Sequence, residues 1–444
     1  MKKTQSASDI NEREAALDIL MSGDVFLNEA IDAFFEKHPG IDKRSRAFIE
    51  ALCVGVTERR LTLDHIISGF STVKLKKMKP VVLWALRLGV YQLKYMDLVP
   101  PSAAVNESVK LVKKRGLAGL SGFVNAILRK VSASDVDAGF DGDLSLRYST
   151  PEWIADLFVK TYGEEMAEKM LSASLEKAPL TARVCPGVNV TALAEELASE
   201  GAKAHPFECM EGVIFIDSLS SLNTCTAFLE GRFTIQDVSS QLVGYIASHI
   251  SAKTVLDICA APGGKALHAA QVLEGSHVLA RDISEKKLSR IRENAKRLGC
   301  ENITLEKFDA TVFDEKSADA FDLVIADLPC SGLGVMGRKC DLKYRVSPED
   351  IESLAALQKT ILENAARYVK AGGYILYSTC TVTEAENVKQ VENFLKEHSF
   401  ESVPIDDKLP EVFRHESAAS GYVQLLQGVD PCDGFFIALM KRLS

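Results

Sequence analysis

Residues 254–265 read Thr-Val-Leu-Asp-Ile-Cys-Ala-Ala-Pro-Gly-Gly-Lys, and this stretch decides the fold of the C-terminal half of the chain. Its first five residues form a short apolar run typical of a buried strand. A glycine-rich turn follows, and then a helical pattern to about Leu273. From Phe233 onward, short apolar strands alternate with amphipathic helices in the same way. The alternation predicts an α/β Rossmann-like domain, a doubly wound sheet, over residues 233–444.

The rest of this half continues the pattern. We expect strands around Val278 and over 303–308, 321–326 and 374–377, with helices over 285–298 and 348–369. A last helix is expected to begin near Thr383, because Thr383 and Glu386 have the Thr-x-x-Glu spacing of a capping box.

The residues that follow the predicted strands are rich in carboxylates. Ligands bind an open sheet of this kind at the carboxyl ends of its strands, and Asp282, Asp309 and Asp327 each follow a different strand. A single aspartate at such a position is usually a turn or capping residue. Three of them at successive strand ends indicate a binding site.

The glycine-rich turn narrows the class of ligand. It lacks the Gly-x-Gly-x-x-Gly spacing that seats a pyrophosphate, and it lacks the Walker pattern, but Gly263 and Gly264 allow a small ligand to approach the backbone closely. Asp282 is placed to accept two ribose hydroxyls, and Asp309 to meet an adenine edge. A nucleoside without phosphates, such as S-adenosylmethionine, fits this set. We expect the ligand to be held by Cys259, Ala260, Ala261, Pro262, Gly263, Gly264, Lys265, Asp282, Asp309 and Asp327.

Two thiols stand in the same set of turns. Cys330 follows Pro329, and Cys380 lies between Thr379 and Thr381, so both should project toward the ligand edge, where a lysine or a helix N-terminus favours the thiolate. A pair of buried structural cysteines is the alternative. Because both turns are polar, we expect this pair to be functional and the other eight cysteines to be structural, Cys259 partly excepted.

The N-terminal part of the chain has a different character. Residues 11–130 carry helical patterns throughout, such as the apolar face that follows Pro80. Residues 1–135 hold 21 Lys and Arg against 15 Asp and Glu, a net charge of +6, whereas the remaining residues carry −15. We expect an all-α head over 1–135 whose basic clusters bind RNA phosphates. There are three such clusters in chain order: Lys74, Lys76, Lys77 and Lys79; Lys110, Lys113, Lys114 and Arg115; and Arg129 and Lys130. A merely solvated basic face is the alternative.

A polar, acidic stretch over 132–145 is predicted to be a linker. Beyond it, a helical pattern from Trp153 to Ala173 and short strands over 181–184 and 213–216 predict a small α+β module over 146–232. Such modules commonly hold a substrate strand.

Composition excludes several protein classes. The chain has 444 residues, of which 47% are hydrophobic and 25% charged, so a disordered or fibrous protein is excluded. No apolar run is long enough to span a bilayer, and the opening residues do not resemble a signal peptide, so we expect a cytoplasmic protein without a membrane partner. The ten cysteines include no Cys-x-x-Cys pair, so we expect neither a disulfide framework nor a metal site.

Short motifs in the head resemble the NusB family of all-helical RNA-binding modules. They are Gly55-Val56-Thr57, Leu63-Asp64, Val99-Pro100, Val105-Asn106-Glu107 and residues 123–128. The resemblance covers about the first 130 residues and implies an RNA partner.

Longer motifs in the C-terminal half resemble the RNA cytosine-C5 methyltransferases. They are residues 233–241, 259–265, 327–332, 379–381 and 433–436. Together with the NusB-like head, the whole chain resembles the RsmB (Sun/Fmu) type of bacterial enzyme, which implies methylation of small-subunit (16S) ribosomal RNA with S-adenosyl-L-methionine. The departures are Leu328, Thr381 in place of a frequent Ser, and Cys340 where Pro is common; they make the target nucleotide less certain.

The resemblance implies a covalent mechanism. C5 of cytosine is a poor nucleophile, so a thiolate must first add to C6, and Cys380 is the candidate for this step. Asp327 would hydrogen-bond the N3/N4 edge of the base, and Lys265 would either orient Asp327 or lower the pKa of a thiol. Cys330 would assist release of the adduct. The base must leave its stack to reach the site.

Other interpretations remain open. Cys330 could be the nucleophile, since DNA cytosine methyltransferases also use a Pro-Cys dipeptide. The substrate could be transfer RNA, or the chain could be a non-catalytic ribosome assembly factor. We expect a monomer.

Overall fold

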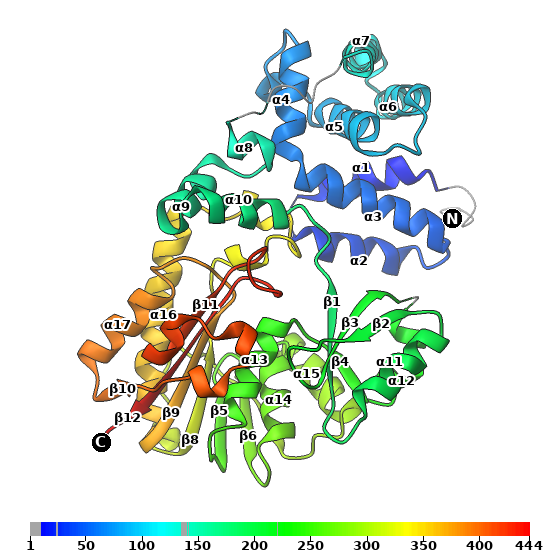
Figure 1. Cartoon of the computed structure of the whole chain (residues 1–444). Helices are drawn as coiled ribbons and strands as arrows, with labels where there is room; N and C mark the ends of the chain where they lie inside the picture. The colour runs from blue at the N-terminus through cyan, green and yellow to red at the C-terminus, as the bar shows by residue number, and fades with distance from the viewer. Residues whose placement is uncertain (1–9, 24, 135–139, 141, 220) are drawn as a thin grey trace. The chain divides into compact units, whose positions relative to one another are not determined.

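The computed structural model describes residues 10–23, 25–134, 140, 142–219 and 221–444. The opening segment and part of the predicted linker over 132–145 lie outside the described residues. The chain forms two compact units, one made of 1–176 with 336–345 and the other of 177–335 with 346–444 (Figure 1). These units divide the chain at other positions than the expected domain boundaries at 135, 146 and 233, which stay a prediction.

The first unit is built from helices, which confirms the predicted all-α head. Its helices are α1 (Glu12–Ser22), α2 (Leu27–Lys37), α3 (Lys43–Glu58), α4 (Arg60–Phe70), α5 (Pro80–Tyr95), α6 (Pro101–Lys114), α7 (Ser121–Ser132), α8 (Leu144–Arg147), α9 (Glu152–Tyr162) and α10 (Glu164–Ala173). Pro80 and Pro101 each occupy a first helical position, where no amide donor is needed. Helices α5 and α7 pack closely at Gly89, where a Cβ atom would lie 2.6 Å from a methyl carbon of Leu128.

Residues 336–345 belong to this first unit although they come from the C-terminal half of the chain. The Asp341 carboxylate accepts the amide of Leu27, the first residue of α2, at 3.0 Å. The Tyr344 hydroxyl donates to the Ser149 carbonyl at 2.9 Å, and the Cys340 side chain is buried in the helical core. The head is therefore completed by a segment that the sequence analysis assigned to the catalytic domain.

A small sheet opens the second unit. It comprises β1 (Leu180–Val184), β2 (Lys203–Pro206), β3 (Val213–Ser218) and β4 (Phe233–Ile235) in the order β2-β3-β1-β4, together with helices α11 (Val190–Ser199) and α12 (Thr226–Leu229). The sequence analysis predicted β1 and β3 but not β2. It also placed Phe233 at the start of the catalytic domain, whereas β4 pairs with β1 here.

The larger sheet has eight strands and confirms the Rossmann-like prediction. They are β5 (Thr254–Asp257), β6 (His277–Asp282), β7 (Ile303–Lys307), β8 (Phe321–Asp327), β9 (Val369–Thr379), β10 (Phe400–Ser402), β11 (Tyr422–Leu425) and β12 (Phe435–Arg442). The order is β10-β12-β9-β8-β5-β6-β7, with β11 paired to β12. Strands β5 to β9 run parallel to their neighbours in this set. The sequence analysis did not predict the last three strands, which pair antiparallel at one edge.

Both faces of this sheet are covered by helices, and successive residues of each parallel strand point to opposite faces. Val255 packs toward α13 (Val238–Ala247), α14 (Gly264–Val272) and α15 (Glu285–Arg297), whereas Leu256 packs toward α16 (Pro348–Tyr368) and α17 (Val388–Glu397). This two-sided burial explains why the strands are apolar runs rather than alternating patterns. The predicted start of the last helix near Thr383 is wrong, since α17 begins at Val388 and Glu386 is turned toward another loop.

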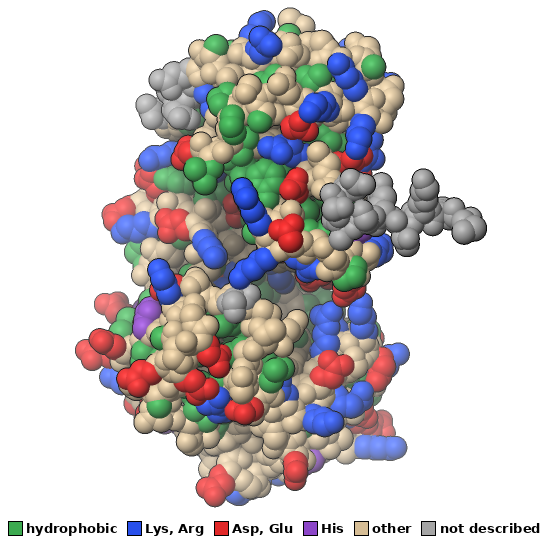
Figure 2. Space-filling model, turned by 90° about the vertical axis from the view of Figure 1, so that its right-hand side faces the viewer, with side chains coloured by type: hydrophobic (Ala, Val, Ile, Leu, Met, Phe, Trp, Pro, Cys, Tyr) green, Lys and Arg blue, Asp and Glu red, His purple; other side chains and the backbone are tan. Residues whose placement is uncertain are grey.

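The surface carries no single extended block of one charge on the face shown in Figure 2, where Lys and Arg side chains lie in small groups with Asp and Glu side chains among them. In the part of the chain that the structure describes, no helix is long and apolar enough to cross a membrane.

Candidate active site

Three aspartates end neighbouring strands of the large sheet. Asp257 ends β5, Asp282 ends β6 and Asp327 ends β8, and β5 lies between the other two strands. Parallel strands bring their carboxyl ends to one edge, so the sheet gathers these carboxylates together. Asp257 was not among the residues proposed from the sequence.

The glycine-rich turn is hydrogen-bonded to Asp282. The Asp282 carboxylate accepts the amide of Ala261 at 3.2 Å with one oxygen and the amide of Ser284 at 2.9 Å with the other. Gly263 has φ +105°, a conformation that L side chains rarely adopt, and α14 begins directly after it. The turn over 259–265 and Asp282 thus form one cradle.

Asp309 lies beyond the end of β7. One oxygen of its carboxylate accepts both the amide and the hydroxyl of Thr311, and these bonds lower the pKa of Asp309. Two apolar side chains near these acids are solvent-exposed: Ile283 is 62% exposed and Val312 is 55% exposed. Exposed apolar side chains of this kind can pack against the face of a flat ring. Sequence reasoning missed both, although an isoleucine directly after a strand-end aspartate was a visible signal.

Asp327 is held on both sides by polar side chains. Lys265 donates to one carboxylate oxygen of Asp327 at 2.7 Å, and the Ser378 hydroxyl donates to the other at 2.8 Å. The charge of Asp327 and its hydrogen bond to Lys265 outweigh the opposing effect of burial, so the pKa of Lys265 is raised. The predicted pairing of Lys265 with Asp327 is therefore present in the structure.

The two predicted thiols meet. The Sγ atoms of Cys330 and Cys380 lie 3.3 Å apart, although the residues follow different strands. The hydrogen bond with Cys380, followed by burial, raises the pKa of Cys330 well above its ordinary value. Either sulfur can donate the hydrogen bond that joins the two thiols.

Asp257 is 1% exposed and lies beneath this group of polar residues. Burial, and then the charge of Asp327, raises the pKa of the Asp257 carboxyl to about 8, whereas the unfolded chain titrates near 4. Between these values the folded state holds a proton that the unfolded state has lost, so stability falls as the pH rises.

Replacing Asp257 by Asn should therefore stabilise the folded protein more at pH 8 than at pH 5. The amide keeps the shape of the protonated carboxyl but does not have to take up a proton on folding. Thermal unfolding of both proteins at the two pH values measures this. An equal difference at both pH values would mean that Asp257 does not titrate between them.

Close backbone packing fixes the loop after Cys330. The Gly334 amide donates to the Cys380 carbonyl at 3.1 Å, and the Gly334 carbonyl accepts the amide of Gly434 at 2.9 Å. A Cβ atom on Gly334 would lie 2.0 Å from the Gly434 carbonyl oxygen, so no side chain fits there.

We expect Gly334→Ala to destabilise the protein by roughly 1–3 kcal/mol, because overpacking forces backbone movement. The control is Gly337→Ala, whose Cβ would meet its nearest neighbour, the Ala173 carbonyl oxygen, at 3.5 Å. Urea unfolding of the two variants measures the difference, and equal stabilities would contradict the close packing.

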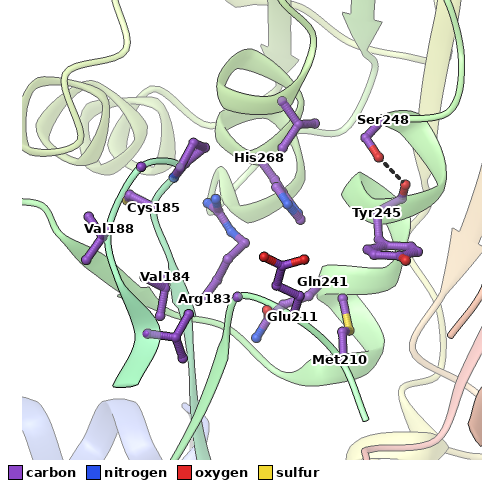
Figure 3. Close-up of a pocket in the computed structure, with 15 residues that line it drawn as sticks. Arg183, Val184, Cys185, Val188, Met210, Glu211, Gln241, Tyr245, Ser248 and His268 are labelled. Carbon is purple, nitrogen blue, oxygen red and sulfur yellow. Dashed lines mark hydrogen bonds between the residues drawn. The ribbon is translucent and has the colours of Figure 1, made fainter. Parts of the chain in front are cut away.

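Figure 3 shows a separate cavity of about 250 Å³ in the second unit, lined by residues of β1, α13 and α14. The Arg183 side chain in its wall is 3% exposed and binds the side-chain oxygens of Gln236 and Gln271. Arg183 Nη2 and His268 Nδ1 are sealed from solvent. None of the residues predicted to bind a ligand lines this cavity.

Within the residues that the structure describes, no cluster of three or more His, Cys, Asp or Glu side chains could hold a metal ion.

Three protein-family models match successive parts of this chain. The family model of the 16S rRNA methyltransferase RsmB/F matches residues 247–441, the NusB family model matches 10–133, and the ferredoxin-like domain of RsmF/B-like methyltransferases matches 150–222. A probable ribosomal RNA small subunit methyltransferase B from Bacillus subtilis is 33% identical, with 100% of both chains covered. The chain belongs to the RsmB/F family.

Other relatives agree with the RsmB/F assignment. A probable ribosomal RNA small subunit methyltransferase B from Synechocystis is 33% identical over 98% of this chain and 97% of its own. Among solved structures, the crystal structure of PH0851 superposes with a TM-score of 0.82 at 23% identity, covering 99% of this chain and 100% of that one, so it shares the fold. A methyltransferase homolog from Pyrococcus horikoshii is 26% identical with a TM-score of 0.58, covering 68% of this chain and 98% of its own. The chain is therefore a methyltransferase of the RsmB/F family, with a helical NusB domain, a ferredoxin-like module and a Rossmann-like domain.

Proposed function

We propose that this RsmB/F family methyltransferase methylates C5 of a cytosine in small-subunit (16S) ribosomal RNA, through a covalent cysteine adduct at C6 and with S-adenosyl-L-methionine as methyl donor. The observation that carries the proposal is the contact between the sulfur atoms of Cys330 and Cys380 at 3.3 Å. Two adjacent thiols suit a reaction that must both form and break a bond to one carbon.

The residues at the strand ends fit the proposed methyl donor. The turn over 259–265 and Asp282 form a cradle without a pyrophosphate seat, and the exposed side chains of Ile283 and Val312 suit the faces of an adenine ring. Asp309 stands at the same edge. When bound, S-adenosyl-L-methionine supplies an electrophilic methyl group.

The chain's own groups would then act in sequence. Cys380 attacks C6 of the cytosine, while Asp327, fixed by Lys265 and Ser378, hydrogen-bonds the N3/N4 edge and stabilises the negative charge that develops on the ring. The ring carbon C5 takes the methyl group. The C5 proton is then lost to solvent, and the C6–S bond breaks with its electron pair returning to the sulfur of Cys380, which restores the aromatic ring. Cys330 assists this release.

The head is proposed to bind RNA through the first of its predicted basic clusters rather than the second. Lys74, Lys76, Lys77 and Lys79 are all exposed around Leu75–Lys77. In the second predicted cluster, Lys110 pairs with Glu107, Lys114 with Glu14 and Arg115 with Asp18. Intramolecular carboxylates thus already neutralise much of the second cluster, which favours the first as the phosphate-binding surface.

Replacing Lys74, Lys76, Lys77 and Lys79 by Ala should weaken RNA binding and flatten its salt dependence. The slope of log K against log salt should fall by about 0.7–0.9 for each phosphate that the variant no longer neutralises. Cofactor affinity should not change. Replacing Lys110 and Lys114 by Ala is the control, and filter binding at several salt concentrations measures both. An unchanged slope in the fourfold variant would make the first cluster a solvated surface. Deleting the whole head is a poorer test, because residues 336–345 are packed within it.

The proposal is tested by bisulfite sequencing of ribosomal and transfer RNA from cells that lack this protein. Loss of one protected cytosine in small-subunit RNA is the expected result. Loss in transfer RNA would favour that substrate instead. No loss in either RNA, together with no binding of S-adenosyl-L-methionine, would favour a non-catalytic assembly factor. The proposed substrate implies a cytoplasmic location, and the monomeric state stays a prediction.

A further inference from the structure

Glu386 is completely buried, which is unusual for a glutamate, and its carboxylate is surrounded by donors. The backbone amide of Ser331 donates to Oε1 at 2.7 Å. The hydroxyls of Ser331 and Thr383 each donate to Oε2 at 2.6 Å. The Thr381 hydroxyl lies 3.4 Å from Oε2, and Gln358 Nε2 lies 3.3 Å from Oε1. The mechanism described above does not use this carboxylate.

The donors come from the two loops that carry the thiols. Ser331 directly follows Cys330, and Thr381 directly follows Cys380. Asp327 and Ser378 form the last register pair between β8 and β9. The loops that carry Cys330 and Cys380 begin after this pair. Beyond that pair the ladder no longer sets the distance between the loops.

The two loops are not held equally well without Glu386. The loop of Cys380 is held by Asn387, whose Nδ2 donates to the Thr381 carbonyl at 2.9 Å. The bond from the Gly334 amide to the Cys380 carbonyl joins this loop to the residues that follow Cys330. The loop of Cys330 is fixed through the Ser331 amide, which donates to Glu386, and through the Pro329 carbonyl, which accepts from Gln358 at 2.8 Å. The Ser331 hydroxyl also lies 2.7 Å from the Thr381 hydroxyl, but both hydroxyls are oriented by Oε2 of Glu386. Gln358 itself contacts Glu386. Loss of this carboxylate should therefore displace Cys330 more than Cys380.

We propose that Glu386 is a positioning residue that holds the sulfur of Cys330 against that of Cys380. The inference rests on the proposed function for its catalytic consequence: when the loop of Cys330 loosens, release of the adduct slows more than attack by Cys380. A carboxylate suits this place because two acceptor oxygens face an amide and several hydroxyls. The amide of a glutamine keeps only one of these acceptors, so Gln should restore the arrangement in part.

The first test measures geometry and does not depend on the reaction. Dibromobimane becomes fluorescent only when both of its alkylating arms have reacted with thiols, and mass spectrometry of the digested full-length protein identifies the Cys330–Cys380 bridge. We expect this bridge to form at least about tenfold more slowly in Glu386→Ala than in the unmodified protein, because small displacements cost large factors in proximity-controlled reactions. Glu386→Gln should give an intermediate rate. The matched control is Glu384→Gln, which changes an exposed glutamate of the same turn that pairs with Lys389.

Unchanged bridging in folded Glu386→Ala would overturn the proposal. Should Glu386→Ala fail to fold, Glu386→Gln and Ser331→Ala decide instead, and unchanged bridging in both would overturn it equally.

The second test measures the catalytic consequence. Glu386→Gln should accumulate a covalent protein–RNA complex on a denaturing gel, as Cys330→Ala should, while its single-turnover methyl transfer falls less than its multiple-turnover rate. An equal fall in both rates without accumulation would reduce Glu386 to a structural residue. Slower bridging in the Glu386 variants, with no complex in any variant including Cys330→Ala, would leave the positioning role intact and contradict the proposed function.

Discussion

A Cys380→Ala protein should form no covalent complex with RNA, and its methyl transfer should fall by at least about 10³-fold, as expected when an attacking nucleophile is removed. A Cys330→Ala protein should still attack the base and should accumulate the complex, because the thiol that assists release is missing. A denaturing gel with labelled RNA and S-adenosyl-L-methionine distinguishes the two proteins. The two sulfur atoms lie 3.3 Å apart, so either thiol could reach C6 of the same base, and the two variants separate their roles.

The opposite pattern would assign the attack to Cys330, as in DNA cytosine methyltransferases. Cys432→Ala is a suitable control, since Cys432 is another partly exposed cysteine that was not predicted to react. A complex that persists in both single variants but disappears in the double variant would mean that either thiol can attack.

Asp282→Ala should lower the affinity for S-adenosyl-L-methionine by roughly 1.5–3 kcal/mol for each hydrogen bond to a ribose hydroxyl that it removes, which amounts to at least tenfold for one bond. The effect should exceed that of Asp282→Asn, because the Asp282 carboxylate also accepts the amides of Ala261 and Ser284 and an amide oxygen retains part of this function. Titration calorimetry measures both variants.

Asp309→Asn provides a comparison for Asp282, because the Asp309 carboxylate accepts hydrogen bonds from the amide and the hydroxyl of Thr311, a residue of its own turn. Undiminished cofactor binding by Asp282→Ala would remove Asp282 from the proposed site.

Much of the fold follows from local patterns. The strand over 254–257, the turn up to Lys265 and the following helix are defined by neighbouring residues, so their sequence predicts them without a partner. The last three strands were missed because their place depends on pairing with β9 and with each other rather than on a helix–strand alternation. The strand β4 was not predicted for the same reason, since its partner β1 lies about 50 residues earlier.

The sequence by itself determined which residues end the parallel strands, and therefore which carboxylates and thiols share one edge, because strand period and turn chemistry are local. Only the tertiary structure decided the distances at that edge. It brought Cys330 to Cys380 across 50 residues, completed the head with residues 336–345, and turned Glu386 from a predicted helix cap into the acceptor of Ser331. The physical reason is that a buried carboxylate takes whichever donors the packed core brings within reach. For Glu386, one donor is Ser331, 55 residues earlier in the loop that follows β8, and another is Thr383 in its own turn.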